Sequence, residues 1–380
     1  MKTINKVLCA AAVAAVAATL AFTQSAATPA TGQESGAPAG RGRGPGRGRG
    51  GDSAYLPTEQ QWDSNPQTQA YIAKAKEVAG DDPDLQFDEG VFCQRSGGAT
   101  GQDRATIGVP NSTPHLQPFP SPNPPQNLGL YRLFDNFYWI GDSGVGTWLI
   151  TSSGGYILFD TLNTPEEARD VLIPSMQKAG LDPAKIKYVV FGHYHLDHTG
   201  GGQYIQSHYH PTMIMGRDDW DLYFKTMESG TGMAARLTDK TPMTRGIDAV
   251  DGMKITVGDV TATIYEMTGH TPGSIGMIVP VEYQGQYHPI LLVTAATDVH
   301  NRESFVGGYE HIWDIGIADG VESVMQVHPN TNMNLLARMK YVNDEYPPAK
   351  NPLLYGPVRT ARYINIMRAC TQARMEALGW

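Results

Sequence analysis

The stretch FGHYHLDHTGG at residues 191–201 decides both the fold and the chemistry of this chain. It contains four side chains of types that can bind metals, which are His193, His195, Asp197 and His198. The apolar run IKYVVF directly before it predicts a buried strand, so the four side chains are expected in the loop at the strand's carboxyl end, where α/β proteins place their chemistry. His193 and His195 are two residues apart, so an extended backbone points both rings the same way. Asp197 and His198 follow as the chain turns, and they can face a second point a few ångströms away.

The rest of the chain predicts an α/β fold. From Leu130 onward, short apolar strands alternate with helices in two similar rounds. This order predicts an αβ/βα sandwich, in which two mixed sheets pack face to face with outer helices. Helices are also expected over residues 67–79, with Gly80 as the stop, and over residues 332–344 and 358–378.

The first 27 residues have the pattern of a cleaved signal peptide. Lys2 and Lys6 give a positive start, an apolar run follows over residues 7–22, and small residues at 25–27 suit cleavage. The apolar run is too short for a comfortable membrane span. We therefore expect a periplasmic or secreted protein with no membrane insertion after signal cleavage.

Residues 28–54 form a linker rich in glycine and arginine, which we expect to be disordered. Its segment AGRGRGPGRGRGG resembles an RNA-binding arginine-glycine repeat, but aromatic residues are missing from it. Removing Lys2 and Lys6 with the signal changes the formal net charge from -9 to -11. Nucleic-acid binding needs a basic face, so the expected partner is a small-molecule substrate and not a nucleic acid. The sequence leaves the oligomeric state open.

Residues 55–128 are expected to form an N-terminal extension, ahead of a catalytic domain over residues 129–380. The run NSTPHLQPFPSPNPPQN ends the extension, and its prolines predict a strap without regular structure. Cleavage of the signal removes Cys9 and leaves Cys93 and Cys370. In an oxidising compartment these two can form one disulfide between the extension and the last helix, and the alternative is two separate buried thiols.

Three motifs together resemble the metallo-β-lactamase superfamily, an αβ/βα sandwich of metal-dependent hydrolases. HYHLDH fits the H-x-H-x-D-H signature, and GHTPGS at residues 269–274 and VHPNTN at residues 327–332 resemble segments of the third subclass of metallo-β-lactamases. The acid of ILFDTL, Asp160, matches the family's first motif, whose aspartate braces the metal loop and does not bind metal. Ser274, the last residue of GHTPGS, is expected beside the ligands and not among them.

The resemblance implies two zinc ions. His193, His195 and His270 would hold one ion, and Asp197, His198 and His328 would hold the second. Asp197 is also expected to be catalytic. Zinc favours imidazole and carboxylate ligands, and a catalytic zinc site keeps one position open for water. Two such ions share a hydroxide and polarise a carbonyl, so the expected reaction is hydrolysis of an amide or ester bond by a metal-bound hydroxide.

One position departs from the third-subclass pattern. The sequence Ala296-Thr297-Asp298 has an acid where that subclass has a serine that contacts a metal-bound water. In the glyoxalase and lactone-hydrolysing members of the superfamily, an aspartate there bridges the metals. Asp298 is therefore a candidate bridging ligand, and the alternative is a residue that caps backbone at the strand's end.

The best single guess for the substrate is a β-lactam ring. The alternative is a lactonase, thioesterase or other esterase on the same site, and a third possibility is an iron-dependent sulfur dioxygenase. We expect no metal role for His208 and His210, although their spacing suggests one, because they lie in a polar segment without further ligands. Tyr194, Trp220 and Tyr223 are expected either to line a substrate pocket or to pack in the core.

Overall fold

The computed structural model describes residues 57–95, 126–294, 302–304, 308, 310–329 and 335–380, and all of these belong to one unit, residues 50–380. The predicted signal peptide, the predicted linker, most of the proline-rich strap and Asp298 lie outside the described residues.

The first sheet contains seven strands in the order β1 to β7. Strands β1 to β4 pair antiparallel, and β4 to β7 pair parallel, so the sheet is mixed as predicted. Its strands are β1 (Asn127–Phe134), β2 (Phe137–Asp142), β3 (Gly146–Ser152), β4 (Gly155–Phe159), β5 (Ile186–Val190), β6 (Thr212–Gly216) and β7 (Ile247–Ala249).

The second sheet contains five strands in the order β12-β11-β10-β9-β8. Strands β8 to β11 pair antiparallel, whereas β11 and β12 pair parallel. Its strands are β8 (Met253–Val257), β9 (Val260–Glu266), β10 (Ile275–Tyr283), β11 (Gln286–Val293) and β12 (Ser323–Gln326).

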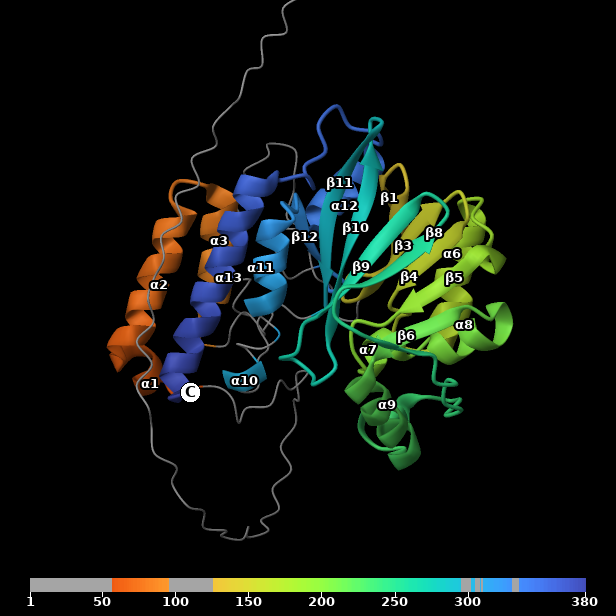
Figure 1. Ribbon diagram of the computed structural model, residues 1–380, viewed down its shortest axis with the longest axis horizontal. Helices are drawn as coiled ribbons and strands as arrows, with labels where there is room; N and C mark the ends of the chain where they lie inside the picture. Colours follow the sequence, from red (N-terminus) through yellow and green to blue (C-terminus); the bar gives the residue numbers. More distant parts are fainter. Residues whose placement is uncertain (1–56, 96–125, 295–301, 305–307, 309, 330–334) are drawn as a thin grey trace, which may run out of the picture. The chain divides into compact units, whose positions relative to one another are not determined.

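Most of the described helices lie on the outer faces of the two sheets (Figure 1). Those ahead of β6 are α1 (Glu59–Ser64), α2 (Pro66–Ala79), α3 (Pro83–Phe92), α5 (Pro165–Glu167), η2 (Ala168–Leu172), α6 (Ile173–Lys178), η3 (Pro183–Lys185), α7 (Leu196–Thr199) and α8 (Gly202–Tyr209). Those after β6 are α9 (Arg217–Ser229), η4 (Gly232–Arg236), α10 (Arg302–Ser304), α11 (Glu310–Ala318), α12 (Leu335–Asp344) and α13 (Pro357–Leu378). None of them is both long enough and apolar enough to cross a membrane.

Three large layers of apolar side chains hold most of these elements together, and a small fourth cluster packs Trp62 of α1 against α13. The central layer lies between the sheets and includes Trp148 of β3 and Ile264 of β9. One outer layer packs the first sheet against α6, α8 and α9, and the other packs the second sheet against α11 and α13. Strands that are buried on both faces, such as β4 with its run GYILF, read as continuous apolar sequence. The layering confirms the predicted αβ/βα sandwich.

The helices of the extension pack against α13. Helix α2 begins where the side chain of Asn65 accepts hydrogen bonds from two backbone N–H groups, and it ends at Gly80, as predicted. Its residue Ala75 and Leu85 of α3 share one apolar cluster with residues of α13. The predicted disulfide between Cys93 and Cys370 is present and joins the end of α3 to α13 across 277 residues of sequence.

A buried ion pair strengthens the contact between the extension and the rest of the fold. The carboxylate of Asp84 in α3 lies 2.5 Å from the guanidinium of Arg338 in α12, and both side chains are 3% exposed. Arg359 of α13 approaches the same carboxylate oxygen at 2.6 Å. Because both side chains are buried, water does not solvate their charges, and the opposite charge of the partner offsets that loss of solvation.

We predict that Asp84→Asn lowers the free energy of unfolding by about 3–5 kcal/mol, because it leaves the buried Arg338 guanidinium without its carboxylate. The exposed Asp81 lies three residues earlier, and Asp81→Asn should have little effect. Denaturant unfolding of both variants measures the difference. Equal stability of the two variants would contradict the prediction.

Candidate metal centre

The candidate metal ligands meet where strands of both sheets end. His193 and His195 lie in the loop after β5, Asp197 and His198 lie on the short helix α7 that continues it, and His328 follows β12. His270 lies in the GHTPGS loop between β9 and β10. The backbone N–H of Ile275, the first residue of β10, donates to the carbonyl of Gly192 at 2.9 Å. This bond joins the two loops, and therefore the two sheets, directly at the site.

Three histidine rings form the first group. Nε2 of His193 lies 3.0 Å from Nδ1 of His195, and Nε2 of His270 lies 3.1 Å from the same Nδ1. The ligand atoms of all three lie within 4.8 Å of one another. The three side chains predicted to share one ion are therefore brought together.

The first group fits a zinc ion. A tetrahedral zinc at ~2.0–2.1 Å from each imidazole nitrogen places two such nitrogens about 3.3 Å apart. The observed separations of 3.0 and 3.1 Å are close to that value. A single cation among the three nitrogens would accept all their lone pairs, whereas one shared hydrogen can serve only one pair of nitrogens.

The second group is built around Asp197. Its Oδ2 lies 3.7 Å from Nε2 of His198 and 3.6 Å from Nε2 of His328. The ligand atoms of His193, Asp197 and His198 also lie within 4.8 Å of one another. His193 therefore borders both groups, a position that the sequence did not predict, and the two groups are direct neighbours.

Two hydrogen bonds fix which ring nitrogens of the second group face Asp197. Nδ1 of His198 lies 2.8 Å from Oδ2 of Asp160, and Nδ1 of His328 lies 2.8 Å from the carbonyl oxygen of Gly144. An ionised carboxylate and a carbonyl only accept hydrogen bonds, so each Nδ1 carries the hydrogen. In the neutral form of each ring, Nε2 is then a lone-pair donor directed at the group, as metal-binding histidines require.

Through its carboxylate, Asp160 contacts the backbone before His193 as well as the ring of His198. Its carboxylate is fully buried, and its Oδ1 also accepts the backbone N–H of Gly192 at 2.9 Å. Its backbone has a φ of 70°, in the left-handed region that costs energy for a residue with a Cβ. The end of β4 therefore holds a strained residue whose carboxylate reaches both Gly192 and His198.

The electrostatics of the cluster favour a cation. Burial, followed by the charges of the neighbouring histidines, lowers the pKa of His193 well below its ordinary value. Burial raises the pKa of Asp197, but His198, His328 and His195 outweigh it and bring that pKa to about 2. Burial likewise lowers the pKa of His198, but the carboxylates of Asp197 and Asp160 outweigh it and leave that pKa raised. Asp197 is therefore ionised at neutral pH.

Residues 140–282 match the family model described as Metallo-beta-lactamase superfamily. A protein of Azorhizobium caulinodans described as N-acyl homoserine lactonase AttM is 30% identical over 187 residues, which cover 42% of this chain and 68% of that protein. The chain belongs to the metallo-beta-lactamase superfamily. A second AttM, from Rhizobium radiobacter, is 30% identical over 155 residues, or 34% of this chain and 57% of that protein.

Solved structures of this superfamily share the fold. The Rm3 metallo-beta-lactamase has a TM-score of 0.55 at 20% identity and covers 67% of this chain and 96% of its own. BJP-1, a subclass B3 metallo-beta-lactamase of Bradyrhizobium japonicum, has a TM-score of 0.52 at 21% identity and covers 67% of this chain and 95% of its own. At these identities the likeness shows the fold alone, and it agrees with the sandwich described above.

Two positioning features of this superfamily member were not foreseen from its sequence. The side chain of Asp142 accepts the backbone N–H groups of Gly144 and Val145 at 2.6 and 2.8 Å, and so orients the carbonyl that holds His328. The Asp-Ser-Gly sequence at the end of β2 is a turn signal that marks this loop.

The second feature is Asp219 in α9, whose carboxylate contacts both ligand loops. No local pattern marks it, because its partners are 25 to 54 residues away.

Ser274 closes the GHTPGS loop. Its hydroxyl accepts the backbone N–H of Thr271 at 3.0 Å and pairs with the Thr271 hydroxyl at 2.6 Å, and its side chain is buried. Tyr194 is partly buried, with its ring 4.6 Å from that of His195. Trp220 and Tyr223 are buried in the layer between the first sheet and its helices, so they pack in the core.

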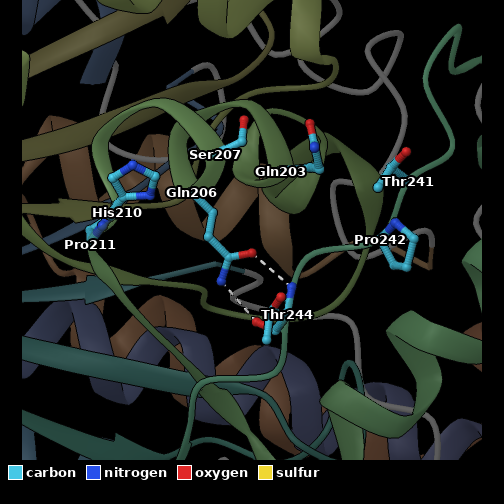
Figure 2. A pocket seen from close by; sticks show the side chains of 8 residues that line it. All are labelled: Gln203, Gln206, Ser207, His210, Pro211, Thr241, Pro242 and Thr244. Carbon is cyan, nitrogen blue, oxygen red and sulfur yellow. Dashed lines mark hydrogen bonds between the residues drawn. The ribbon is translucent and has the colours of Figure 1, made fainter.

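The other described histidines lie apart from the ligand groups. His208 is exposed and stacks on Tyr204. His210 borders a polar hollow beside α8 (Figure 2). There the amide of Gln206 donates to the carbonyl of Thr244 at 2.9 Å and accepts its N–H at 2.7 Å, and these bonds attach the following loop to α8. This hollow is separate from the metal centre.

We predict that Asp160→Asn weakens zinc binding about 10–100-fold, the usual effect of losing a partner of a metal-binding histidine. Asparagine has only one oxygen, so its NH2 would face either the N–H of Gly192 or Nδ1 of His198. In the first orientation the loop before His193 loses its acceptor. In the second, the His198 ring is misoriented or carries its hydrogen on Nε2. The exposed Asp170 is a matched control, and Asp170→Asn should bind zinc normally. Competition with a chelator measures both affinities, and unchanged binding in the Asp160 variant would be contrary to this account.

Proposed function

We propose that this protein is a hydrolase that holds two zinc ions and opens the ring of a lactone. The observation that carries the proposal is the convergence of three ring nitrogens, two of which lie 3.0 and 3.1 Å from Nδ1 of His195, next to a second group in which the ligand atoms of His193, Asp197 and His198 lie within 4.8 Å of one another. The sequence relatives described above are named as N-acyl homoserine lactonases, and this supports a cyclic ester as the substrate class. Zinc ions, when bound, activate a water molecule and polarise the carbonyl that it attacks.

The side chains of the site have distinct tasks in this proposal. One zinc ion would be held by His193, His195 and His270, and the second would be held by Asp197, His198 and His328. Asp197 is ionised, and its Oδ2 lies between the two histidines of the second group. We propose that its Oδ1 would accept the proton of the attacking water and return it to the alkoxide oxygen that is released when the ring C–O bond breaks, so Asp197 would serve as both a ligand and the general base. The ring of Tyr194 borders the site beside His195 and would contact the substrate.

A β-lactam is the second candidate substrate. The GHTPGS motif, with His270 as its ligand and Ser274 closing the loop, favours it. Asp298 favours the lactone, because a carboxylate at that position would bridge the two ions as in lactone-hydrolysing members. A sulfur dioxygenase on the same ligands would contain iron, so the metal content of protein purified without added metal separates it from both hydrolases.

We also propose that the protein is exported to the periplasm or beyond. The positive start, the apolar run and the small residues before residue 28 support this proposal. A disulfide suits an oxidising compartment, and the bond between Cys93 and Cys370 agrees with it.

We predict about two zinc ions per chain and hydrolysis of lactones that depends on them. His193 borders both ligand groups, so His193→Ala should lower hydrolysis to background while the protein stays folded. His208→Ala is the matched control, because His208 is exposed and outside the site. Metal analysis and a side-by-side assay on lactones, thioesters and β-lactams measure both effects. Full activity in the His193 variant, or active protein without metal, would refute the site.

We predict that Asp298→Ser weakens retention of one zinc ion and shifts relative activity from lactones toward β-lactams. The carboxylate would otherwise bridge two cations that offset its desolvation, and serine cannot replace that charge. The ratio of the two activities and the zinc content of the variant are the measurements. A variant that keeps both unchanged would favour the β-lactam candidate and remove the bridging role.

A further inference from the structure

Asp219 is a buried carboxylate that binds both ligand loops of the first group at once. Its Oδ2 accepts the backbone N–H of Tyr194 at 2.9 Å and the hydroxyl of Thr271 at 2.6 Å, and its Oδ1 accepts the backbone N–H of Gly273 at 2.8 Å. The side chain is 0% exposed, and among the described residues no lysine or arginine forms an ion pair with it. Burial raises the pKa of this carboxyl, and the three hydrogen bonds partly offset that effect.

Two of the three donors are direct neighbours of the ligands in sequence, and the third, Gly273, lies three residues after His270. Tyr194 stands between His193 and His195, and Thr271 follows His270 directly. One side chain on α9 therefore ties the backbone that carries two ligands to the backbone that carries the third. A backbone tie between these loops is the hydrogen bond from Ile275 to Gly192, which precedes His193. Together the two ties hold the loops on both sides of the ligands.

The start of α9 packs against the GHTPGS loop without room for a side chain. A Cβ on Gly216, just before α9, would lie 2.0 Å from the carbonyl oxygen of Gly273. A Cβ on Gly273 would lie 2.7 Å from the backbone nitrogen of Asp219. Both distances are shorter than any real contact of a Cβ, so the helix and the loop approach as closely as two backbones can. The carboxylate of Asp219 is thus held at a fixed place relative to His270.

We propose that Asp219 is a positioning residue, which sets the separation of His193 and His195 from His270 and thereby the affinity of the first metal position. This inference rests on the proposed metal centre but not on the identity of the substrate. A carboxylate is needed because its two oxygens accept from three donors in two directions. An asparagine would turn its NH2 toward Gly273 on one side, or toward Tyr194 and Thr271 on the other, and would push the loops apart.

The test is a Co²⁺ titration of the metal-stripped full-length protein, followed by the absorption bands of the bound ion. The variants are Asp219→Asn and the control Asp218→Asn, an exposed neighbour in the same turn of α9. We expect two equivalents of Co²⁺ to bind the native protein and Asp218→Asn. In Asp219→Asn we expect one equivalent to bind about 10–100-fold more weakly with altered bands, the usual effect of losing a partner that orients ligands.

A merely structural role would lower the unfolding midpoint of Asp219→Asn and leave its Co²⁺ affinities unchanged, and that result overturns the proposal. If Asp219→Asn does not fold, Thr271→Val removes one of the three donors at nearly constant volume, and one Co²⁺ should again bind more weakly. Native affinity in that variant also overturns the proposal. Failure of the native protein to bind Co²⁺ would instead refute the metal centre, so the two failures are distinct.

Discussion

The hydrogen bond between Nδ1 of His198 and the carboxylate of Asp160 is the interaction on which the site depends. The two atoms are 2.8 Å apart, and both side chains are at most 1% exposed. The bond fixes the His198 ring with Nε2 toward Asp197, and the other carboxylate oxygen holds Gly192 just before His193. A buried carboxylate in a strained backbone is costly, and the two bonds offset that cost only while the loop keeps its conformation.

The same principle recurs around the cluster, because each ligand loop is held by an oxygen that can only accept hydrogen bonds. The carbonyl of Gly144 orients His328, and the carboxylate of Asp219 binds the loops of His193 and His270. These acceptors come from three separate parts of the fold, which are the loop between β2 and β3, the residue directly after β4, and helix α9. The sandwich therefore positions the ligands through both side-chain and backbone hydrogen bonds to these acceptors.

The sequence predicted the parts of the site that lie close together along the chain. The run from His193 to His198 could be recognised because it places four candidate ligands within six residues. The alternation of strands and helices predicted the sandwich. Asp219 was not predicted, since its role depends on contacts that only the folded chain creates. Helix α3 was also missed, although Asp82 before Pro83 is a recognisable start whose side chain accepts two backbone N–H groups.

The central claim is that six side chains in two neighbouring groups hold two metal ions. Crystals grown with zinc and measured at the zinc absorption edge test it most directly. We expect two anomalous peaks, one within ~2.0–2.1 Å of the facing nitrogens of His193, His195 and His270, and one at a similar distance from Asp197, His198 and His328. Zinc peaks elsewhere, for example at His208 and His210, with none at these residues would contradict it.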